Sequence, residues 1–379
     1  ETPYAKLLTQ LFGPRMYIAN ATGCSSIWGG SAPGIPYTKN EKGQGPAWAN
    51  SLFEDNAEYG YGMYLAQDTM RKRLIREAEA LVGDIEAPHE KEVLENYLAT
   101  LEDGEANLAA TDTLIDVLSK SLDPRAQQLL HHKQFLSKKS NWILGGDGWA
   151  YDIGFGGLDH VMASGADVNV LVFDTEVYSN TGGQMSKSTP TGAVAQFAAN
   201  GKEGTKKDLA YMMMTYGSVY VAQVALGADF NQTLKAFREA ESFPGPSLII
   251  AYSPCINHGI RGGMVNADIE MKKAVECGYW NLFRYDPRRK AEGKNPFQMD
   301  SKAPTGDYQA FLKNEVRYSA LMRTYPERAS RLFDRAEVNA IGRHERLLQW
   351  EALSGKLVAA EAEEVEREAA SRRAEAEKQ

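Results

Sequence analysis

Short apolar segments alternate with helical patterns along the middle of the chain. Four segments are apolar at nearly every position, as in strands that are buried on both faces of a parallel sheet: Trp142–Leu144, Val168–Phe173, Val219–Val224 and Ser247–Tyr252. Helical periodicity covers the segments between them, at about 151–164, 208–216 and 231–242. This alternation predicts an α/β fold, in which helices cover a parallel twisted sheet.

The first sixty residues belong to the same predicted layer. The segment Met16–Ala19 is apolar and predicts a further strand, which runs into Asn20 and on to Cys24. Residues 25–50 are rich in glycine, proline and aromatic residues and show no clear period, so we expect a long loop. A loop of that length inside a compact domain usually has a function.

The remaining segments are mostly helical in pattern. Residues 61–140 repeat leucines at helical spacing and predict a helical insertion without catalytic chemistry. Residues 286–330 contain several prolines and predict an extended stretch. We therefore expect one α/β domain from two segments, an insertion and a helical tail: 1–60 with 141–330, 61–140, and 331–379.

The tail carries an apolar stripe on an otherwise charged helix pattern. Its residues are Leu348, Trp350, Leu353 and Leu357. Such a stripe requires a surface to cover it, either in the core of this chain or in a neighbouring subunit. We expect the intact protein to be a homo-oligomer.

Composition excludes several classes of protein. The 379 residues are 43% hydrophobic with a net charge of −8, which argues against disorder and against a basic nucleic-acid-binding surface. The apolar runs are too short to cross a bilayer. Three scattered cysteines do not make a disulfide framework and favour a reduced, cytoplasmic protein. The chain begins with Glu1, so we expect it to be processed or to be part of a longer protein.

Polar and glycine-rich segments follow four predicted strands. They contain Cys24, the turn Gly145–Trp149, the segment Asp174–Gly183, and Cys255 with His258. Ligands of open parallel sheets bind outside the carboxyl ends of the strands, so these segments should meet at one edge. We assign no catalytic role to His258.

The glycine turn around Asp147 predicts a phosphate site. Backbone N–H groups and the start of the following helix would face the anion. Asp147 would repel a phosphate unless a divalent cation lies between them, which indicates a diphosphate bridged by Mg²⁺. Thr175 follows the next strand and is a suitable second oxygen ligand. Neither a dinucleotide-binding fingerprint nor a P-loop fits the glycines of this chain.

Three segments together resemble a known family. They are Ala19–Gly29, Gly146–Gly154 and Thr175–Gln184, and they are similar to the carboxy-terminal thiamine-diphosphate domain of pyruvate:ferredoxin (flavodoxin) oxidoreductases. The likeness covers about residues 1–330 and implies the thiamine-diphosphate-binding fold. The last fifty residues carry none of it.

The resemblance implies a role for each site residue. Asp147, Thr175 and the carbonyl of Val177 would hold Mg²⁺, and Asn180 would face the substrate. The resemblance implies that thiamine diphosphate is lined by Glu1, Cys24, Gly146, Asp147, Gly148, Trp149, Thr175, Glu176, Val177, Tyr178, Ser179 and Asn180.

The same resemblance assigns two cysteines to an iron–sulfur cluster. Cys24 and Cys255 match two of the four thiolates that hold a 4Fe–4S cluster in the family. The other two belong to a Cys-x-x-Cys-Gly motif that precedes the position of Glu1, so we expect them in a preceding segment. We expect Cys277 to be a buried, unligated residue.

The implied reaction is the oxidative decarboxylation of pyruvate with coenzyme A to acetyl-CoA and CO₂. Electrons would pass through 4Fe–4S clusters to ferredoxin or flavodoxin, and coenzyme A would bind elsewhere in the enzyme. One alternative is a non-oxidative thiamine-dependent decarboxylase, which would have no use for the two cysteines. The other is a cofactor-binding fragment that is inactive alone, because the glutamate that activates thiamine comes from the remaining domains in this family.

Overall fold

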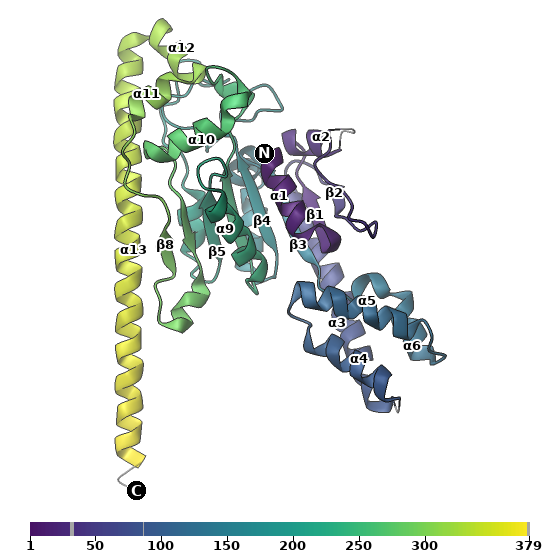
Figure 1. Cartoon of the computed structure of the whole chain (residues 1–379). Helices are drawn as coiled ribbons and strands as arrows, with labels where there is room; N and C mark the ends of the chain where they lie inside the picture. Colours follow the sequence, from purple (N-terminus) through teal and green to yellow (C-terminus); the bar gives the residue numbers. More distant parts are fainter. Residues whose placement is uncertain (31–33, 86, 377–379) are drawn as a thin grey trace.

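The computed structural model describes residues 1–30, 34–85 and 87–376, and a sheet forms the centre of this part of the chain (Figure 1). Its strand order is β2-β1-β3-β4-β6-β5-β7-β8. The strands are β1 (Met16–Asn20), β2 (Ala47–Asn50), β3 (Ser140–Gly146), β4 (Asn169–Asp174), β5 (Tyr220–Val224), β6 (Ser247–Tyr252), β7 (Phe283–Tyr285) and β8 (Phe297–Met299).

The sheet is mostly parallel. Strands β1 to β6 pair in parallel, whereas β7 and β8 add an antiparallel edge. Strands β4, β5 and β6 are buried at every position, as their uninterrupted apolar runs predict. The predicted α/β class is therefore confirmed, and the antiparallel edge is an addition that the apolar runs did not indicate.

Helices cover both the sheet and its ends. They comprise α1 (Thr2–Phe12), α2 (Cys24–Gly30), α7 (Phe155–Ala163), α8 (Leu209–Met214), α9 (Phe230–Ser242), α10 (Ala267–Glu276), α11 (Tyr308–Lys313) and α12 (Val316–Thr324). Short single-turn helices are η1 (Gly13–Arg15), η2 (Lys133–Phe135), η4 (Ile256–His258), η5 (Met264–Asn266) and η6 (Pro287–Glu292). One hydrophobic cluster joins the helices to the sheet, and Trp142, Phe173 and Phe237 are fully buried in it.

Two predicted irregular stretches contain regular structure. Residues 25–50, expected to be a loop, include most of α2 and strand β2. Residues 286–330, expected to be extended, include α11 and α12. These helices are too short to show a hydrophobic period. Helix α11 is instead specified locally by Asp307, whose side chain accepts a hydrogen bond from the backbone N–H of Ala310.

A second hydrophobic cluster lies among four helices outside the sheet. The helices are α3 (Asn56–Asp84), α4 (Pro88–Ala99), α5 (Gly104–Leu118) and α6 (Pro124–His131). Leu74, Leu94, Tyr97, Leu114 and Leu129 are fully buried in this cluster. Figure 1 draws these helices away from the centre of the sheet. Where domain boundaries fall stays a prediction.

Helix α13 (Pro326–Ala376) runs along the antiparallel edge of the sheet (Figure 1). Leu347 is 1% exposed, and the Trp350 ring packs on Tyr211. Leu348, Leu353 and Leu357 are about half exposed, so the residues of the predicted stripe do not share one covered face. In the described residues, no helix is long and apolar enough to cross a membrane.

Candidate cofactor site

A cavity of about 170 Å³ lies where β1, β3 and β4 end. Most of the residues predicted to bind the cofactor line it, although they come from segments far apart in the chain. These are Glu1, Cys24, Gly146, Asp147, Gly148, Thr175, Val177, Tyr178, Ser179 and Asn180. Asn180 is exposed, which suits a residue at the entrance rather than on the floor of the cavity.

Trp149 is absent from this lining, because it is fully buried beneath the glycine turn. A Cβ atom at Gly145 or Gly154 would lie 2.5 Å or 2.3 Å from its ring, so both glycines make room for the indole. Gly148 is restricted in the same way, because its Cβ would lie 2.6 Å from the Tyr178 ring. The glycines therefore shape the turn through close packing.

The helix after the turn begins earlier than predicted. A π-helical segment, η3 (Gly148–Ile153), starts immediately after Asp147 and leads into α7. The first backbone N–H groups of this segment have no partner within the helix, and such groups are suited to an anion. The geometry is consistent with the predicted phosphate cradle, which begins at Gly148 rather than near Tyr151.

Three oxygen atoms meet beside the turn. The Thr175 hydroxyl lies 2.8 Å from Asp147 Oδ1 and 3.0 Å from the Val177 carbonyl oxygen. Neighbouring oxygen ligands in an octahedron with Mg–O distances of 2.0–2.1 Å are separated by about 2.9 Å. The two distances from the Thr175 hydroxyl are therefore close to the separation of neighbouring ligands in a magnesium coordination sphere.

Asp147 is fully buried, and within the described residues its carboxylate forms no direct ion pair. Ser186 Oγ donates to Oδ2 at 2.5 Å, and the backbone N–H of Thr175 donates to Oδ1 at 3.1 Å. Burial, and then the nearby Asp174 carboxylate, raise the pKa of Asp147 to about 7. A divalent cation at this position would remove that penalty, so the residues present fit the metal that the sequence predicts.

The site differs from a cluster of ionisable ligands. Among the described residues, no group of three or more His, Cys, Asp or Glu side chains is arranged to hold a metal ion. The three oxygens described above come from one carboxylate, one hydroxyl and one carbonyl. Mg²⁺ commonly takes one or two protein carboxylates and completes its shell with water and phosphate oxygens, so this donor set is sufficient.

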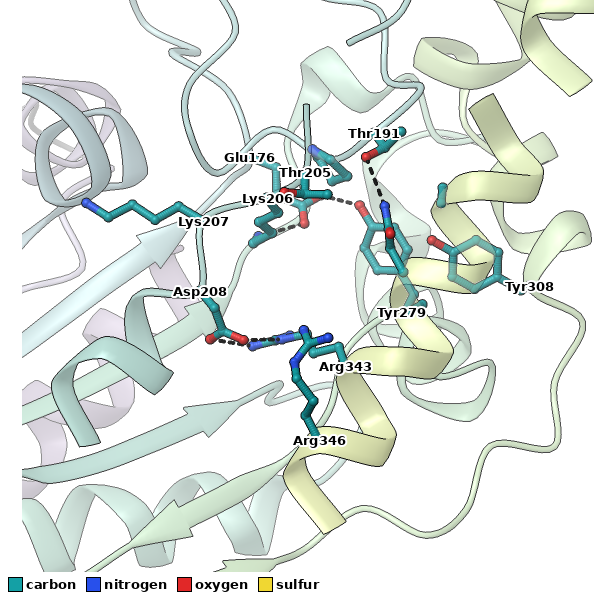
Figure 2. A pocket seen from close by; sticks show the side chains of 14 residues that line it. Glu176, Thr191, Thr205, Lys206, Lys207, Asp208, Tyr279, Tyr308, Arg343 and Arg346 are labelled. Carbon is teal, nitrogen blue, oxygen red and sulfur yellow. Dashed lines mark hydrogen bonds and ion pairs between the residues drawn. The ribbon is translucent and has the colours of Figure 1, made fainter. Parts of the chain in front are cut away.

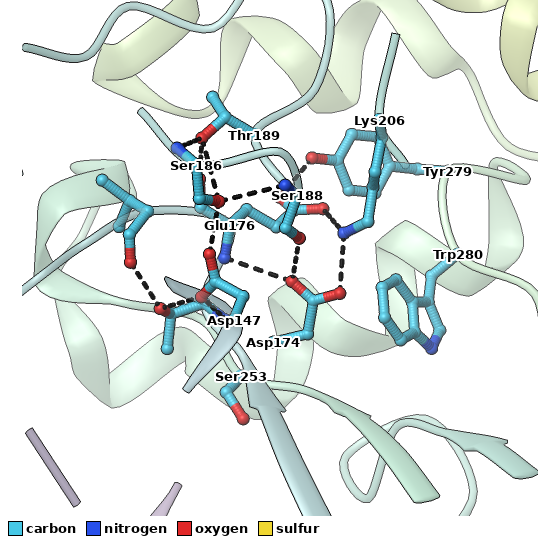
Figure 3. Close-up of polar contacts among 12 residues, drawn as sticks. Asp147, Asp174, Glu176, Ser186, Ser188, Thr189, Lys206, Ser253, Tyr279 and Trp280 are labelled. Carbon is cyan, nitrogen blue, oxygen red and sulfur yellow. Dashed lines mark hydrogen bonds and ion pairs between the residues drawn. The ribbon is translucent and has the colours of Figure 1, made fainter. Parts of the chain in front are cut away.

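The chain makes a sharp turn between Thr175 and Val177. Glu176 has a φ of 60°, in the left-handed region that non-glycine residues rarely adopt. Its side chain reaches Lys206 and Tyr279, as Figure 3 shows, and Glu176 is not among the residues that line the cofactor cavity. Glu176 was predicted to line the cofactor, and its carboxylate instead belongs to a buried network on the far side of the turn.

This network joins carboxylates and cations behind the cavity. Lys206 Nζ lies 2.8 Å from both Asp174 Oδ2 and Glu176 Oε1. Arg317 and the Tyr279 hydroxyl donate to Glu176 Oε2 at 2.8 Å and 2.5 Å. Burial alone would raise the pKa of Glu176, but Lys206 and Arg317 outweigh it and lower the pKa to about 2.

A histidine completes the support of the turn. His258 Nε2 lies 2.7 Å from the Thr175 carbonyl oxygen, and its Nδ1 lies 3.5 Å from Glu315 Oε1. Glu315 also pairs with Arg317 at 2.6 Å. The sequence placed His258 near the site without a role, and gave no signal for Lys206, Tyr279, Glu315 or Arg317, which lie in segments remote from the glycine turn.

A separate cavity lies behind the same network. It has a volume of about 280 Å³ and is lined by residues of α13 and by Glu176, Lys206 and Tyr279 (Figure 2). Arg343 of α13 reaches Asp208 at 2.9 Å and the Gln223 side chain at 2.7 Å. Helix α13 is thereby fastened close to the residues that support the predicted site.

Cys24 lines the cofactor cavity, and Cys255 stands at the start of η4, whose residue Asn257 reaches the same part of the site. Cys24 Sγ lies 3.0 Å from Ser179 Oγ, and Asn257, two residues after Cys255, donates through its side chain to the Ser179 carbonyl at 3.5 Å. Burial raises the pKa of both thiols. Cys277 lies at the end of α10, where its thiol donates to the Ala274 carbonyl at 3.6 Å.

Known proteins match this chain closely. Residues 130–251 match the family of thiamine pyrophosphate enzymes, C-terminal TPP binding domain. The pyruvate-flavodoxin oxidoreductase of Klebsiella pneumoniae is 55% identical over 358 residues, which are 94% of this chain and 30% of that protein. The pyruvate:ferredoxin oxidoreductase of Moorella thermoacetica is 56% identical over 355 residues, which are 91% of this chain and 30% of that protein.

The chain is also similar in sequence to part of a pyruvate dehydrogenase. The mitochondrial pyruvate dehydrogenase [NADP(+)] of Euglena gracilis is 52% identical over 352 residues, 91% of this chain and 19% of that protein. This chain thus spans about a third or less of the length of these relatives. The chain is therefore similar to about a third of the pyruvate-flavodoxin and pyruvate:ferredoxin oxidoreductases, and its residues 130–251 match a C-terminal TPP binding domain.

Proposed function

We propose that this chain supplies the thiamine diphosphate and magnesium site of an enzyme that oxidatively decarboxylates pyruvate with coenzyme A. The observation that carries the proposal is the meeting of Asp147, Thr175 and Val177 oxygens beside a glycine turn, in a cavity that the predicted residues line. The relatives, all named as pyruvate oxidoreductases or dehydrogenases, support the substrate.

The residues of this chain divide the work of binding. Asp147, Thr175 and the Val177 carbonyl hold Mg²⁺, and the turn from Gly146 to Gly148 receives the diphosphate. When bound, thiamine diphosphate supplies the carbanion chemistry and electron sink that decarboxylation of a 2-oxo acid requires. Asn180, exposed at the cavity, orients the substrate carbonyl and carboxylate by hydrogen bonds.

Cys24 and Cys255 provide two ligands of a 4Fe–4S cluster in this proposal. Cys24 lies beside Ser179, which also lines the cofactor cavity, and Asn257, two residues after Cys255, contacts the same serine, so electrons removed from the substrate would have a short path. The other two thiolates come from a segment outside this chain, and the acceptor is ferredoxin or flavodoxin. A non-oxidative decarboxylase would have no use for two thiols at this position.

Further parts of the enzyme complete the activity. Coenzyme A binds in the remaining domains, which also supply the carboxylate that activates thiamine, so this chain is inactive by itself. The intact enzyme works in the cytoplasm as a homo-oligomer. The share of the relatives that this chain covers, about 30%, supports the further domains, and the exposed leucines of α13 support the oligomer.

Calorimetry with thiamine diphosphate and Mg²⁺ tests the proposal in the enzyme that contains this chain. Asp147→Asn should abolish cofactor binding, whereas Asp159→Asn is a control because Asp159 contacts Tyr216 outside the cavity. Asn180→Ala should retain the cofactor and lower turnover. Unchanged affinity in Asp147→Asn, or equal loss of cofactor in Asn180→Ala, would overturn the assignment.

A further inference from the structure

The three proposed magnesium ligands depend on an unfavourable backbone turn. Thr175 and Val177 flank Glu176, whose φ of 60° reverses the chain between them. Because of this reversal, a side-chain hydroxyl and a carbonyl two residues apart lie 3.0 Å from each other. A non-glycine residue in this conformation is strained, so it persists only where the surrounding structure holds it in place.

The structure contains a buried set of groups that hold this residue. We call it the Glu176 clamp: Lys206, Tyr279 and Arg317, which contact the Glu176 carboxylate at 2.8 Å, 2.5 Å and 2.8 Å. In addition, the Glu176 backbone N–H donates to Asp174 Oδ1 at 3.2 Å. Both carboxylate oxygens and the backbone N–H are therefore occupied, and Glu176 is 1% exposed.

The members of the clamp are themselves fixed. Lys206 also pairs with Asp174, and its ammonium lies 5.0 Å from the centre of the Trp280 ring. Arg317 also pairs with Glu315, which is fully buried. The Tyr279 ring packs on Phe311 with centroids 4.7 Å apart. Moving one of these paired groups away would leave its partner as an uncompensated buried charge, which costs several kcal/mol of folding free energy. The clamp is therefore rigid.

We infer that Lys206, Tyr279 and Arg317 are positioning residues that set the magnesium site by holding Glu176 in its left-handed conformation. This inference rests on the proposed function, because it assigns to the clamp the geometry of Thr175 and Val177 as ligands. None of the three residues contacts the cofactor cavity. Their effect passes through the backbone of residues 175–177 to the metal.

Two substitutions of Glu176 distinguish the effect of backbone strain on Mg²⁺ binding from the effect of losing the charge. Glu176→Ala and Glu176→Gly both remove the carboxylate, so in both variants Lys206 and Arg317 lose one partner and keep Asp174 and Glu315. Glycine adopts a positive φ without strain, whereas alanine does not. The inference predicts that both variants bind Mg²⁺ more weakly than the wild type, and that the glycine variant binds it at least about fivefold more tightly than the alanine variant.

The measurement is a Mg²⁺ titration of the intact enzyme at saturating thiamine diphosphate, followed by calorimetry. The KM for pyruvate should change little in the glycine variant, because Glu176 does not line the cavity in which we place the substrate. If the carboxylate had only a structural role, the two variants would bind Mg²⁺ equally, or the alanine variant would bind it more tightly, because alanine loses less backbone entropy on ordering than glycine. Equal affinities in the two variants, or tighter binding in the alanine variant, would overturn the inference.

Two less disruptive substitutions test the same inference if the Glu176 variants do not fold. Tyr279→Phe removes one hydroxyl donor to Glu176 and should weaken Mg²⁺ binding by about threefold or more. Tyr308→Phe is the matched control, since its ring lies 6.0 Å from that of Tyr279. In the described part of the chain, the Tyr308 hydroxyl has no contact with Glu176 within hydrogen-bond distance, and Figure 2 labels both tyrosines. Equal effects of the two changes would contradict the clamp.

These outcomes are distinct from a failure of the proposed function. If the wild-type enzyme and Asp147→Asn bind thiamine diphosphate and Mg²⁺ alike, the metal site itself is assigned wrongly, and the clamp inference falls with it. If the wild type binds and Asp147→Asn does not, the metal site stands. The relative Mg²⁺ affinities of Glu176→Ala and Glu176→Gly then test the clamp inference separately from the metal site.

Discussion

The buried carboxylate of Asp147 lowers the stability of the metal-free fold, and the same carboxylate is a ligand of the proposed Mg²⁺ site. Its folded pKa of about 7 lies above the ordinary value of 3.8, because burial and Asp174 disfavour the charged form. A raised carboxyl pKa contributes stability below pH 3.8, and this contribution is lost as the pH rises towards 7. At pH 8 without metal, the charged Asp147 therefore destabilises the fold.

Asp147→Asn should consequently stabilise the metal-free protein while removing the cofactor site. We expect its thermal midpoint at pH 8 to equal or exceed that of the wild type by a few degrees. The increase in midpoint on adding thiamine diphosphate and Mg²⁺ should disappear. Thermal unfolding at pH 5 and pH 8 checks this, and a large loss of metal-free stability at pH 8 would show that the carboxylate is needed for folding.

Glu176 has the opposite dependence on pH. Its folded pKa of about 2 lies below the ordinary 4.5, because Lys206 and Arg317 outweigh burial. Its charge contributes stability above pH 4.5, and this contribution is lost as the pH falls towards 2. We expect Glu176→Gln to cost on the order of 3 kcal/mol of unfolding free energy at pH 7.

The cost of Glu176→Gln should shrink as the pH falls from 4.5. Denaturant unfolding of wild type and variant between pH 3 and pH 7 measures it. Glu203→Gln is a suitable control, because Glu203 pairs with arginines of α13 at the surface, where ion pairs contribute little. A difference between Glu176→Gln and wild type that does not change with pH would argue against the charged clamp.

At the scale of elements, the residues of the site lie at the ends of parallel strands. Helix α13 packs along the antiparallel edge of the sheet, beside β8. Leu347 and Arg343 make α13 part of the fold, since one is buried and the other pairs with Asp208. Removing residues 334–379 should therefore expose core residues, cost on the order of several kcal/mol and lower the thermal midpoint by roughly 5 °C.

A shorter truncation separates the two halves of α13. Removing residues 360–379 leaves the contacts of Arg343, Leu347 and Val358 in place and should change the thermal midpoint little. Sedimentation of both truncated proteins reports whether the half-exposed Leu348, Leu353 and Leu357 join subunits. Equal melting of wild type and the longer truncation would show that α13 is not part of the core.

At the scale of the whole molecule, Cys24 and Cys255 test whether this chain contributes to a larger electron path. They are separated by more than two hundred residues, yet Cys24 contacts Ser179 at the cavity and Asn257, two residues after Cys255, contacts the same serine. In the intact enzyme, Cys24→Ser or Cys255→Ser should remove one cluster and stop electron delivery, because four thiolates are the usual complement of a 4Fe–4S cluster.

The third cysteine is the internal control for that experiment. Cys277 lies at the end of α10 and contacts Ala274, so Cys277→Ser should leave the iron content unchanged. Anaerobic iron analysis with electron paramagnetic resonance on the three variants makes the comparison. Full iron content in the Cys24 and Cys255 variants, or a cluster lost with Cys277, would rule out the assignment.

The sequence by itself determined the features that depend on neighbours along the chain. The buried strands β4, β5 and β6 were predictable because a strand covered on both faces must be apolar throughout. The meeting of Asp147 and Thr175 was also predictable, since both directly follow parallel strands, whereas the Val177 carbonyl was implied only by the family resemblance. Short helices such as α11, and the antiparallel edge, had no periodic signal to indicate them.

Only the tertiary structure decided how the site is supported. Glu176 meets Lys206, Tyr279 and Arg317, which are 30, 103 and 141 residues away in the sequence. A buried carboxylate requires cationic and hydroxyl partners, but any that the folded chain brings near will satisfy it. The residue types therefore reveal that partners are needed, whereas the path of the chain decides which ones they are.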